Sequence, residues 1–215
     1  MTTTYRSILA LSVGLIVSAS VSVPAATIAW TNLAGGNWSA PANWSPNQLP
    51  GASDNVLITS NGFYMVTMDV NATIGTLTVG SSGGEQMLAM GGSTLQINGA
   101  GSVGTYGYLS ISGGAIQGPG VLTVNGRCDW WGGALAGGAF LTVGSGGDLN
   151  ILNGFNVQGV LTNLGTVNWQ GGSIQEYNNT AQGGTYTGQI WNALGAVWNI
   201  ECNQWLLGVR RRAVS

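Results

Sequence analysis

An internal repeat is the feature of this chain that most constrains its fold. Residues 113–124 (GGAIQGPGVLTV) recur 19 positions later as residues 132–143 (GGALAGGAFLTV), and seven of the twelve positions are identical. Parts of residues 121–133 recur 39 positions later in residues 160–172, a shift close to twice the first. Such periods are typical of solenoids, in which each repeat buries its apolar residues only against neighbouring repeats.

Within the repeats, apolar and polar residues alternate over a few positions and then meet a turn. The recurring unit is Leu, any residue, then Val or Ile, and it begins at Leu77, Leu95, Leu109, Leu122, Leu141 and Leu149. Alternation closed by glycine or Asn-Gly indicates short strands, and no segment has a sustained helical period. We therefore predict an all-β fold, a parallel right-handed β-helix or solenoid with about 19 to 20 residues per turn. A β-sandwich of hairpins is the alternative, because Asn-Gly also suits hairpin turns.

The N-terminus has the pattern of a secretory signal peptide. Arg6 supplies one positive charge, residues 8–17 are apolar, and small residues lead to Ala25 and Ala26. We expect cleavage after Ala25 or Ala26, so residues 1–26 form the signal peptide and the mature chain is exported. No transmembrane span is expected after its removal, since no second hydrophobic segment follows.

The remaining chain divides into three parts. Residues 27–54 contain three of the nine tryptophans and three of the five prolines, which predicts an aromatic N-terminal cap over the first turn. Residues 55–207 carry the repeats and form the predicted solenoid. Residues 208–215 are a basic tail, for which a truncated end is one interpretation.

Charge and composition exclude several functions. Between the signal peptide and the tail, seven acidic residues face a single base, Arg127, so a nucleic-acid partner is not expected. The chain contains no histidine and no lysine, and it therefore lacks the most common general bases and metal ligands. We expect a protein that is not an enzyme and that has no cofactor, with bound calcium as the one exception considered below.

The first part of the mature chain also carries recognisable motifs. These are Asn-Trp-Ser at residues 37–39, Leu-Pro-Gly at 49–51 and Asp-Asn-Val-Leu-Ile at 54–58, followed by Leu-Thr-Val and Trp-x-Gly-Gly repeats. Together they resemble the β-solenoid regions of bacterial autotransporter-like and PEP-CTERM-type secreted surface proteins. The resemblance implies a bacterial, adhesin-like protein that is extracellular or at the cell surface. The chain departs from such proteins at its end, which has neither a membrane barrel nor a hydrophobic sorting tail.

The strand around Asp129 supplies the candidate site. Alternation directs Asp129 and Trp131 outward, the 19-residue shift places Asp148 over Asp129, and the 39-residue shift places Asn168 in the same column. We predict that these four residues bind a ligand. Calcium would neutralise the two carboxylates, and an exposed indole beside amides also suits a sugar. The alternatives are two solvated acids brought together by the spacing alone and a Trp131 covered by a loop.

The two cysteines are predicted to be free thiols. Cys128 and Cys202 are 74 positions apart, near four turns of the expected solenoid, which is too far for a disulfide. Cys128 also matches Val167 in the 39-residue repeat, and Trp130 matches Trp169, so all four should lie in the core.

Two functional hypotheses follow from these patterns. The first is a structural or adhesive β-solenoid that is secreted or at the cell surface and has no catalytic activity. The alternative is a glycan-binding or polysaccharide-degrading β-helix protein of the lyase or hydrolase kind. Surface glycans and other components of the extracellular matrix are the expected partners in both cases.

Overall fold

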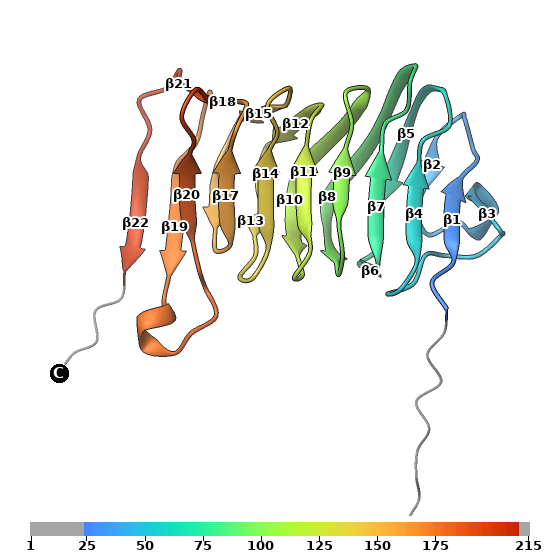
Figure 1. Cartoon of the computed structure of the whole chain (residues 1–215), viewed down its shortest axis with the longest axis horizontal. Helices are drawn as coiled ribbons and strands as arrows, with labels where there is room; N and C mark the ends of the chain where they lie inside the picture. Colours follow the sequence, from blue (N-terminus) through green and yellow to red (C-terminus); the bar gives the residue numbers. More distant parts are fainter. Residues whose placement is uncertain (1–23, 211–215) are drawn as a thin grey trace, which may run out of the picture.

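The computed structural model describes residues 24–210, which wind into a solenoid of parallel β-strands (Figure 1). The strands stand side by side along the long axis of the molecule, with β1 at one end and β22 at the other. Six turns separate β4 (Asn55–Ile58) from β20 (Gln189–Asn192) on the same face. The predicted all-β parallel solenoid is confirmed, and the β-sandwich alternative is wrong.

Each turn contributes strands to three faces, which we name A, B and C. Face A begins with β1 (Thr27–Trp30) and β4 and continues with β7 (Thr76–Val79), β9 (Gly101–Val103), β11 (Val121–Val124), β14 (Phe140–Val143), β17 (Val160–Asn163) and β20. Face B holds β5 (Gly62–Met68), the first parts of β8 (Gly84–Ile97) and β10 (Gly107–Gln117), then β12 (Arg127–Trp130), β15 (Asp148–Ile151), β18 (Thr166–Trp169) and β21 (Val197–Ile200). Face C holds β6 (Ala72–Ile74), the second parts of β8 and β10, then β13 (Ala134–Leu135), β16 (Phe155–Val157), β19 (Ile174–Asn178) and β22 (Leu206–Arg210). Faces B and C form one branched sheet, because β8 and β10 run from one face into the other.

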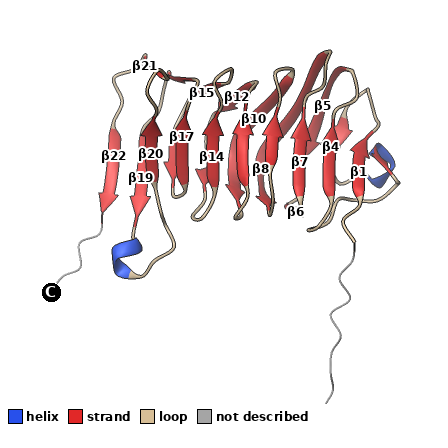
Figure 2. Cartoon of the chain, viewed as in Figure 1, coloured by secondary structure: helices blue, strands red, loops and turns tan. Residues whose placement is uncertain are grey.

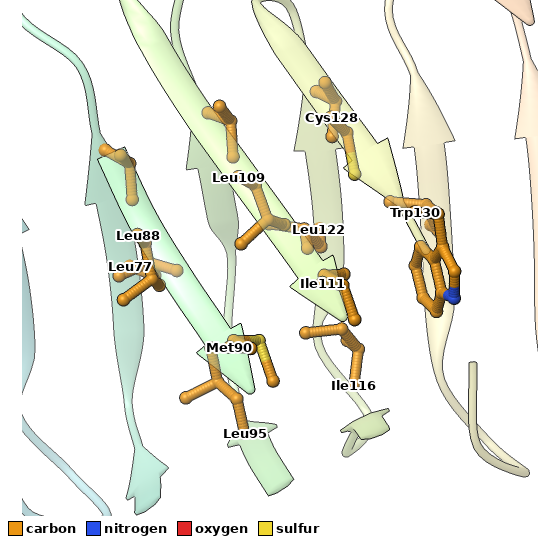
Figure 3. Close-up of a cluster of buried hydrophobic side chains, with 14 of the residues drawn as sticks. Leu77, Leu88, Met90, Leu95, Leu109, Ile111, Ile116, Leu122, Cys128 and Trp130 are labelled. Atoms are coloured by element: carbon orange, nitrogen blue, oxygen red, sulfur yellow. The ribbon is translucent and has the colours of Figure 1, made fainter. Parts of the chain in front are cut away.

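The core consists of columns of apolar side chains that stack from turn to turn. Leu88, Leu109 and Cys128 occupy one inward position of face B on successive turns (Figure 3), and Leu149 and Val167 continue the column. All five are fully buried. The core therefore runs the length of the rod, and each turn buries its inward side chains against the turns on either side.

The inward positions predicted from the 39-residue repeat are confirmed. Cys128 and Val167 lie two turns apart in one column, and Trp130 and Trp169 lie two turns apart in the next. Cys128 is buried and Cys202 is half-buried, and both are free thiols as predicted. Burial raises the pKa of the Cys128 thiol far above its ordinary value, so this cysteine is inert in the folded protein.

The spacing between turns is not fixed at 19 to 20 residues. Leu122 pairs with Leu141 across 19 positions on face A, but Arg127 pairs with Asp148 across 21 on face B. The cause is the corner between the two faces. Two residues, 125 and 126, connect β11 to β12, whereas four residues, 144–147, connect β14 to β15. Corner length thus shifts the register of one face relative to the other, which a single period does not describe.

The repeated Gly-Gly pairs form a corner between faces B and C where backbones come close together. The second glycine of three pairs, at Gly114, Gly133 and Gly172, has a positive φ of 75°, 93° and 66°. A Cβ atom on Gly133 would lie 2.5 Å from the carbonyl oxygen of Gly114 on the preceding turn. Glycine is needed at this corner for its left-handed backbone and for the space it leaves, which explains why the pair recurs in the repeats.

We therefore predict that Gly133→Ala destabilises the protein strongly. The substitution adds a left-handed alanine, which costs about 1–2 kcal/mol, and a steric contact with the neighbouring turn. The measurement is the free energy of unfolding from urea titration. Gly92→Ala is the matched control, because φ is not positive there and no atom lies within 4 Å of its Cβ position. Equal losses in the two variants would contradict this account of the corner.

The N-terminal end of the solenoid is covered. β3 (Trp44–Ser45) pairs antiparallel with the edge of β1, and β2 (Gly36–Asn37) pairs with β5. Trp30, Trp38 and Trp44 are buried there, with the Trp44 ring edge-on to the other two at centroid distances of 4.9 and 4.8 Å. This is the segment for which the cap was predicted. The predicted signal peptide lies mostly outside the described residues.

Helical structure is confined to two short segments (Figure 2). These are the 3-10 helices η1 (Pro41–Asn43), beside the N-terminal end, and η2 (Thr180–Gln182), in a loop that projects from the row of strands between β19 and β20. Neither these helices nor any other within residues 24–210 has the length and apolarity needed to cross a membrane.

Candidate functional site

The predicted site residues lie on or beside the outer surface of face B. Asp129 and Asn168 occupy the same outward column, two turns apart, as the 39-residue shift predicted. Trp131 follows β12 directly, and its backbone N–H donates to the carbonyl of Ile111 at 2.7 Å. Asp148 is the residue that the structure places elsewhere.

The prediction that Asp148 lies over Asp129 is wrong. Asp148 pairs with Arg127, and Asn150 is the residue next to Asp129 in the following turn. The four-residue corner before β15 moves this strand by two positions relative to the 19-residue shift. The two-residue corner before β18 brings the register back, so Asn168 still returns to the Asp129 column. The two carboxylates are therefore not directly opposite each other.

Asp129 is a buried carboxylate, only 2% exposed, that is bound entirely by its neighbours. The Arg127 guanidinium donates to both of its oxygens, with Nε 2.9 Å from Oδ1 and Nη2 on Oδ2. The Tyr108 hydroxyl donates to Oδ2 at 2.8 Å, and the Asn150 amide donates to Oδ1 at 2.8 Å. The Arg127 guanidinium also lies over the Tyr108 ring, 4.6 Å from its centroid.

A ladder of side-chain amides extends from this carboxylate toward the C-terminal end. Asn150 donates to Asp129, Asn168 donates to Asn150 at 2.9 Å, and Asn199 donates to Asn168 at 2.8 Å. The four residues belong to β12, β15, β18 and β21, which are consecutive strands of face B. We call them the amide ladder. Each rung of this ladder ties one turn of the solenoid to the next.

The surroundings of Asp129 set its ionisation state. Burial raises the pKa of this carboxyl, but the hydrogen bonds from Arg127, Asn150 and Tyr108 and the charge of Arg127 outweigh it, so the pKa lies below its ordinary value. Burial and the bond to Asp129 raise the pKa of the Tyr108 hydroxyl, which remains a donor. Asp129 is therefore charged at neutral pH, and its charge is neutralised by Arg127.

These contacts bear on the calcium prediction for Asp129 and Asp148. The oxygens of Asp129 accept hydrogen bonds from protein donors, and Arg127 compensates its charge. No three acidic, histidine or cysteine side chains among residues 24–210 converge in a group suited to a metal. Calcium binding stays a prediction, and Asp148, which is exposed, is the carboxylate that remains accessible to it.

Trp131 is the predicted site residue that solvent reaches. Its side chain is 49% exposed, whereas its neighbour Trp130 is completely buried against Phe155 at a centroid distance of 4.3 Å. About half of the Trp131 side-chain surface is therefore open to solvent, and the interpretation that a loop covers this residue is wrong for that half. The indole remains available as an apolar contact on the outside of the solenoid.

Four partners of the site were not predicted, namely Arg127, Tyr108, Asn150 and Asn199. The sequence does contain a signal for the last two. Each lies between two apolar residues in a short strand, as in Leu149-Asn150-Ile151, Val167-Asn168-Trp169 and Trp198-Asn199-Ile200. An amide side chain that recurs at an outward position on stacked parallel strands can hydrogen-bond with the equivalent amide on the neighbouring strand.

Comparisons with protein-family models, with curated proteins and with solved structures found no match to this chain.

We predict that Asn150→Ala destabilises the fold by about 1–3 kcal/mol, because the substitution removes one hydrogen bond from buried Asp129 and one acceptor from Asn168. The free energy of unfolding from urea titration is the measurement. Asn153→Ala, at an exposed turn position three residues away, is the control and should change stability by less than about 0.5 kcal/mol. A neutral Asn150→Ala variant would show that the ladder contributes nothing to stability.

The low pKa of Asp129 predicts how its contribution depends on pH. The charged carboxylate stabilises the folded state above the ordinary Asp pKa of about 3.9, and this contribution is lost as the pH falls through the lower pKa of the folded state. The difference in unfolding free energy between wild type and Asp129→Asn should thus be constant from pH 6 to pH 8 and shrink below about pH 4. A difference that grows on acidification would be evidence against this assignment.

Proposed function

We propose that this chain is a structural, adhesive β-solenoid that is secreted or at the cell surface and has no catalytic activity. The observation that carries the proposal is that the Asp129 carboxylate is fully hydrogen-bonded within the protein. Each of its two oxygens already accepts two hydrogen bonds, from Arg127 and Asn150 on Oδ1 and from Arg127 and Tyr108 on Oδ2. A catalytic or ligand-binding carboxylate needs an oxygen that is free for the substrate. Asp129 instead joins neighbouring turns.

The shape of the molecule supports the same proposal. Six turns at the strand spacing of about 4.8 Å give a rod of about 29 Å between β4 and β20. Its outer surface on face A presents small hydroxyl side chains on consecutive strands, at Thr78, Ser102, Thr123, Thr142 and Thr162. A rod with an uncharged outer face is suited to act as a spacer and as a contact surface. The resemblance to autotransporter-like and PEP-CTERM-type proteins adds a bacterial, extracellular setting to this proposal.

The test measures turnover and adhesion separately. The purified exported chain is incubated with a panel of polysaccharides, and new reducing ends or unsaturated sugars are assayed. We expect no turnover, and any turnover would overturn the non-catalytic assignment. Surfaces coated with the folded chain should retain bacterial cells or extracellular matrix, while surfaces coated with the heat-unfolded chain should not. Equal retention on both surfaces would remove the adhesive part of the proposal.

Trp131 favours a second candidate, the binding of a glycan without catalysis. Its indole is half-exposed and follows β12, the strand of Asp129, and sugar rings pack their C–H faces against such an indole. A glycan array separates the candidates. If binding occurs here, Trp131→Ala should weaken it at least tenfold, whereas Phe63→Ala should not, although Phe63 is also an exposed aromatic residue of face B.

Export also predicts the first residue of the mature chain. The backbone nitrogen of Ala26 donates to buried Asp54 Oδ1 at 2.9 Å, and the Ala26 carbonyl accepts from Asn55 at 2.7 Å, whereas Ala25 is exposed. Cleavage after Ala25 would turn this contact into an ion pair between the new α-ammonium group and Asp54, whereas cleavage after Ala26 would remove both contacts. We expect N-terminal sequencing of the exported protein to begin at Ala26. Asp54→Asn should lower its melting temperature, and a chain that begins at Thr27 or at Met1 would contradict the prediction.

A further inference from the structure

Four Asn-Gly pairs occur in the described chain, and the asparagine of each pair is exposed. They are Asn61-Gly62, Asn98-Gly99, Asn125-Gly126 and Asn153-Gly154. Asparagine before glycine is prone to deamidation, because glycine has no side chain that hinders its backbone nitrogen from attacking the amide carbon of the asparagine. The sequence does not distinguish the four pairs, but their hydrogen bonds do.

In three of the pairs the glycine N–H is already a hydrogen-bond donor. The acceptors are backbone carbonyls of neighbouring turns, at 3.4 Å from the nitrogen of Gly62, 2.7 Å from that of Gly99 and 3.1 Å from that of Gly126. The side chains of Asn61 and Asn98 are hydrogen-bonded as well. These bonds hold the glycine nitrogen away from the preceding side chain, so attack requires the corner to open first.

The corner at Asn153 and Gly154 lacks these restraints. It connects β15 to β16, between faces B and C. Within residues 24–210, no carbonyl accepts from the Gly154 N–H and no hydrogen bond holds the Asn153 side chain. The φ angle of Gly154 is not positive, unlike that of Gly133 and Gly172 at the corresponding corners of the adjacent turns. The nitrogen that attacks and the amide that it attacks are therefore both free to approach each other.

We propose that Asn153 is a site of spontaneous deamidation in the folded protein, and that hydrogen bonds protect the other three Asn-Gly pairs. Solvent removes the proton of the Gly154 N–H, and this nitrogen attacks Cγ of Asn153. The new N–Cγ bond forms as the Cγ–Nδ2 bond breaks, and Nδ2 leaves as ammonia.

Water then opens the resulting five-membered imide. Cleavage of the N–Cγ bond gives aspartate at position 153, and cleavage of the bond between the nitrogen and the main-chain carbonyl carbon gives isoaspartate. The reaction exchanges ammonia for water, so it needs no oxidant, reductant or further reactant.

The modification changes a corner that is closely packed against the next turn. Gly172 lies against the Asn153–Gly154 peptide, and a Cβ atom on Gly172 would be 2.8 Å from Cα of Asn153. Both products add a carboxylate here, and isoaspartate also adds one methylene group to the main chain. The isoaspartate form should therefore unfold at a lower temperature than the unmodified chain. The inference does not depend on the proposed function, because it concerns the chemistry of this corner alone.

The first test compares the four pairs within one protein. The full exported chain is incubated in mildly alkaline buffer, folded or unfolded in urea, and the deamidated fraction of each pair is measured by peptide mass spectrometry. In the folded chain we expect Asn153 to react about tenfold or more faster than each of the other three, because only those must open first. In urea the four rates should become similar. Equal rates in the folded chain, a faster reaction at another pair, or a preference for Asn153 that persists in urea would overturn the proposal.

The second test blocks the attack at its nitrogen. Gly154→Ala should fold normally, because φ is not positive there and the nearest atom to its Cβ position is the Ser173 carbonyl oxygen at 3.7 Å. The added methyl group hinders the nitrogen, so deamidation of Asn153 in the folded chain should slow about tenfold or more. Gly92→Ala is the matched control and should leave the rate unchanged, since no atom lies within 4 Å of its Cβ position. Deamidation of Asn153 at the wild-type rate in Gly154→Ala would overturn the mechanism.

Discussion

The stacking of each turn on the next is the interaction on which the rest of this structure depends. A turn of about twenty residues has too few inward side chains to form a core alone, so Leu109 is buried only because Leu88 and Cys128 lie above and below it. The same holds for polar groups, because the backbone of each strand finds its hydrogen-bond partners on the neighbouring turns. Stability and exposure at any position therefore depend on whether a further turn follows, which makes the ends of the rod different from its middle.

The repeats predict this architecture because residues that match between repeats lie at equivalent positions on stacked turns. Identical residues at a fixed shift, such as Leu122 and Leu141, pair on adjacent strands of face A. Faces B and C follow less simply, because corners of different length connect them to face A. The corner at residues 144–147 is two residues longer than the corner at 125 and 126, and this local difference alone moves Asp148 from the Asp129 column to the Arg127 column. A period averaged over the chain is therefore a reliable guide to which residues face inward. It is a less reliable guide to which outward residues lie next to each other on adjacent turns.

The candidate site illustrates the same limit. The 39-residue shift predicts correctly that Asp129 and Asn168 share one column, because the long and short corners between them compensate over two turns. The burial of the Asp129 carboxylate was not predicted, because it depends on Tyr108 and Arg127, which reach it from one turn before and from its own strand. Alternation along a strand gives the direction in which a side chain points. It does not indicate whether neighbouring side chains then cover it, and for this reason the sequence does not show that the outward carboxylate of Asp129 is buried.

The direction of the amide ladder gives the rod a chemical polarity. Each asparagine donates toward the N-terminal end, and Asn150 and Asn168 also accept from the next asparagine along the rod. The series must therefore begin at a residue that only accepts and end at an acceptor that is not used. Asp129 is suited to the first position, because a carboxylate accepts several hydrogen bonds and donates none, and Arg127 compensates its charge. Among the described residues Asn199 holds the last position, where the same rule leaves its side-chain oxygen without a donor.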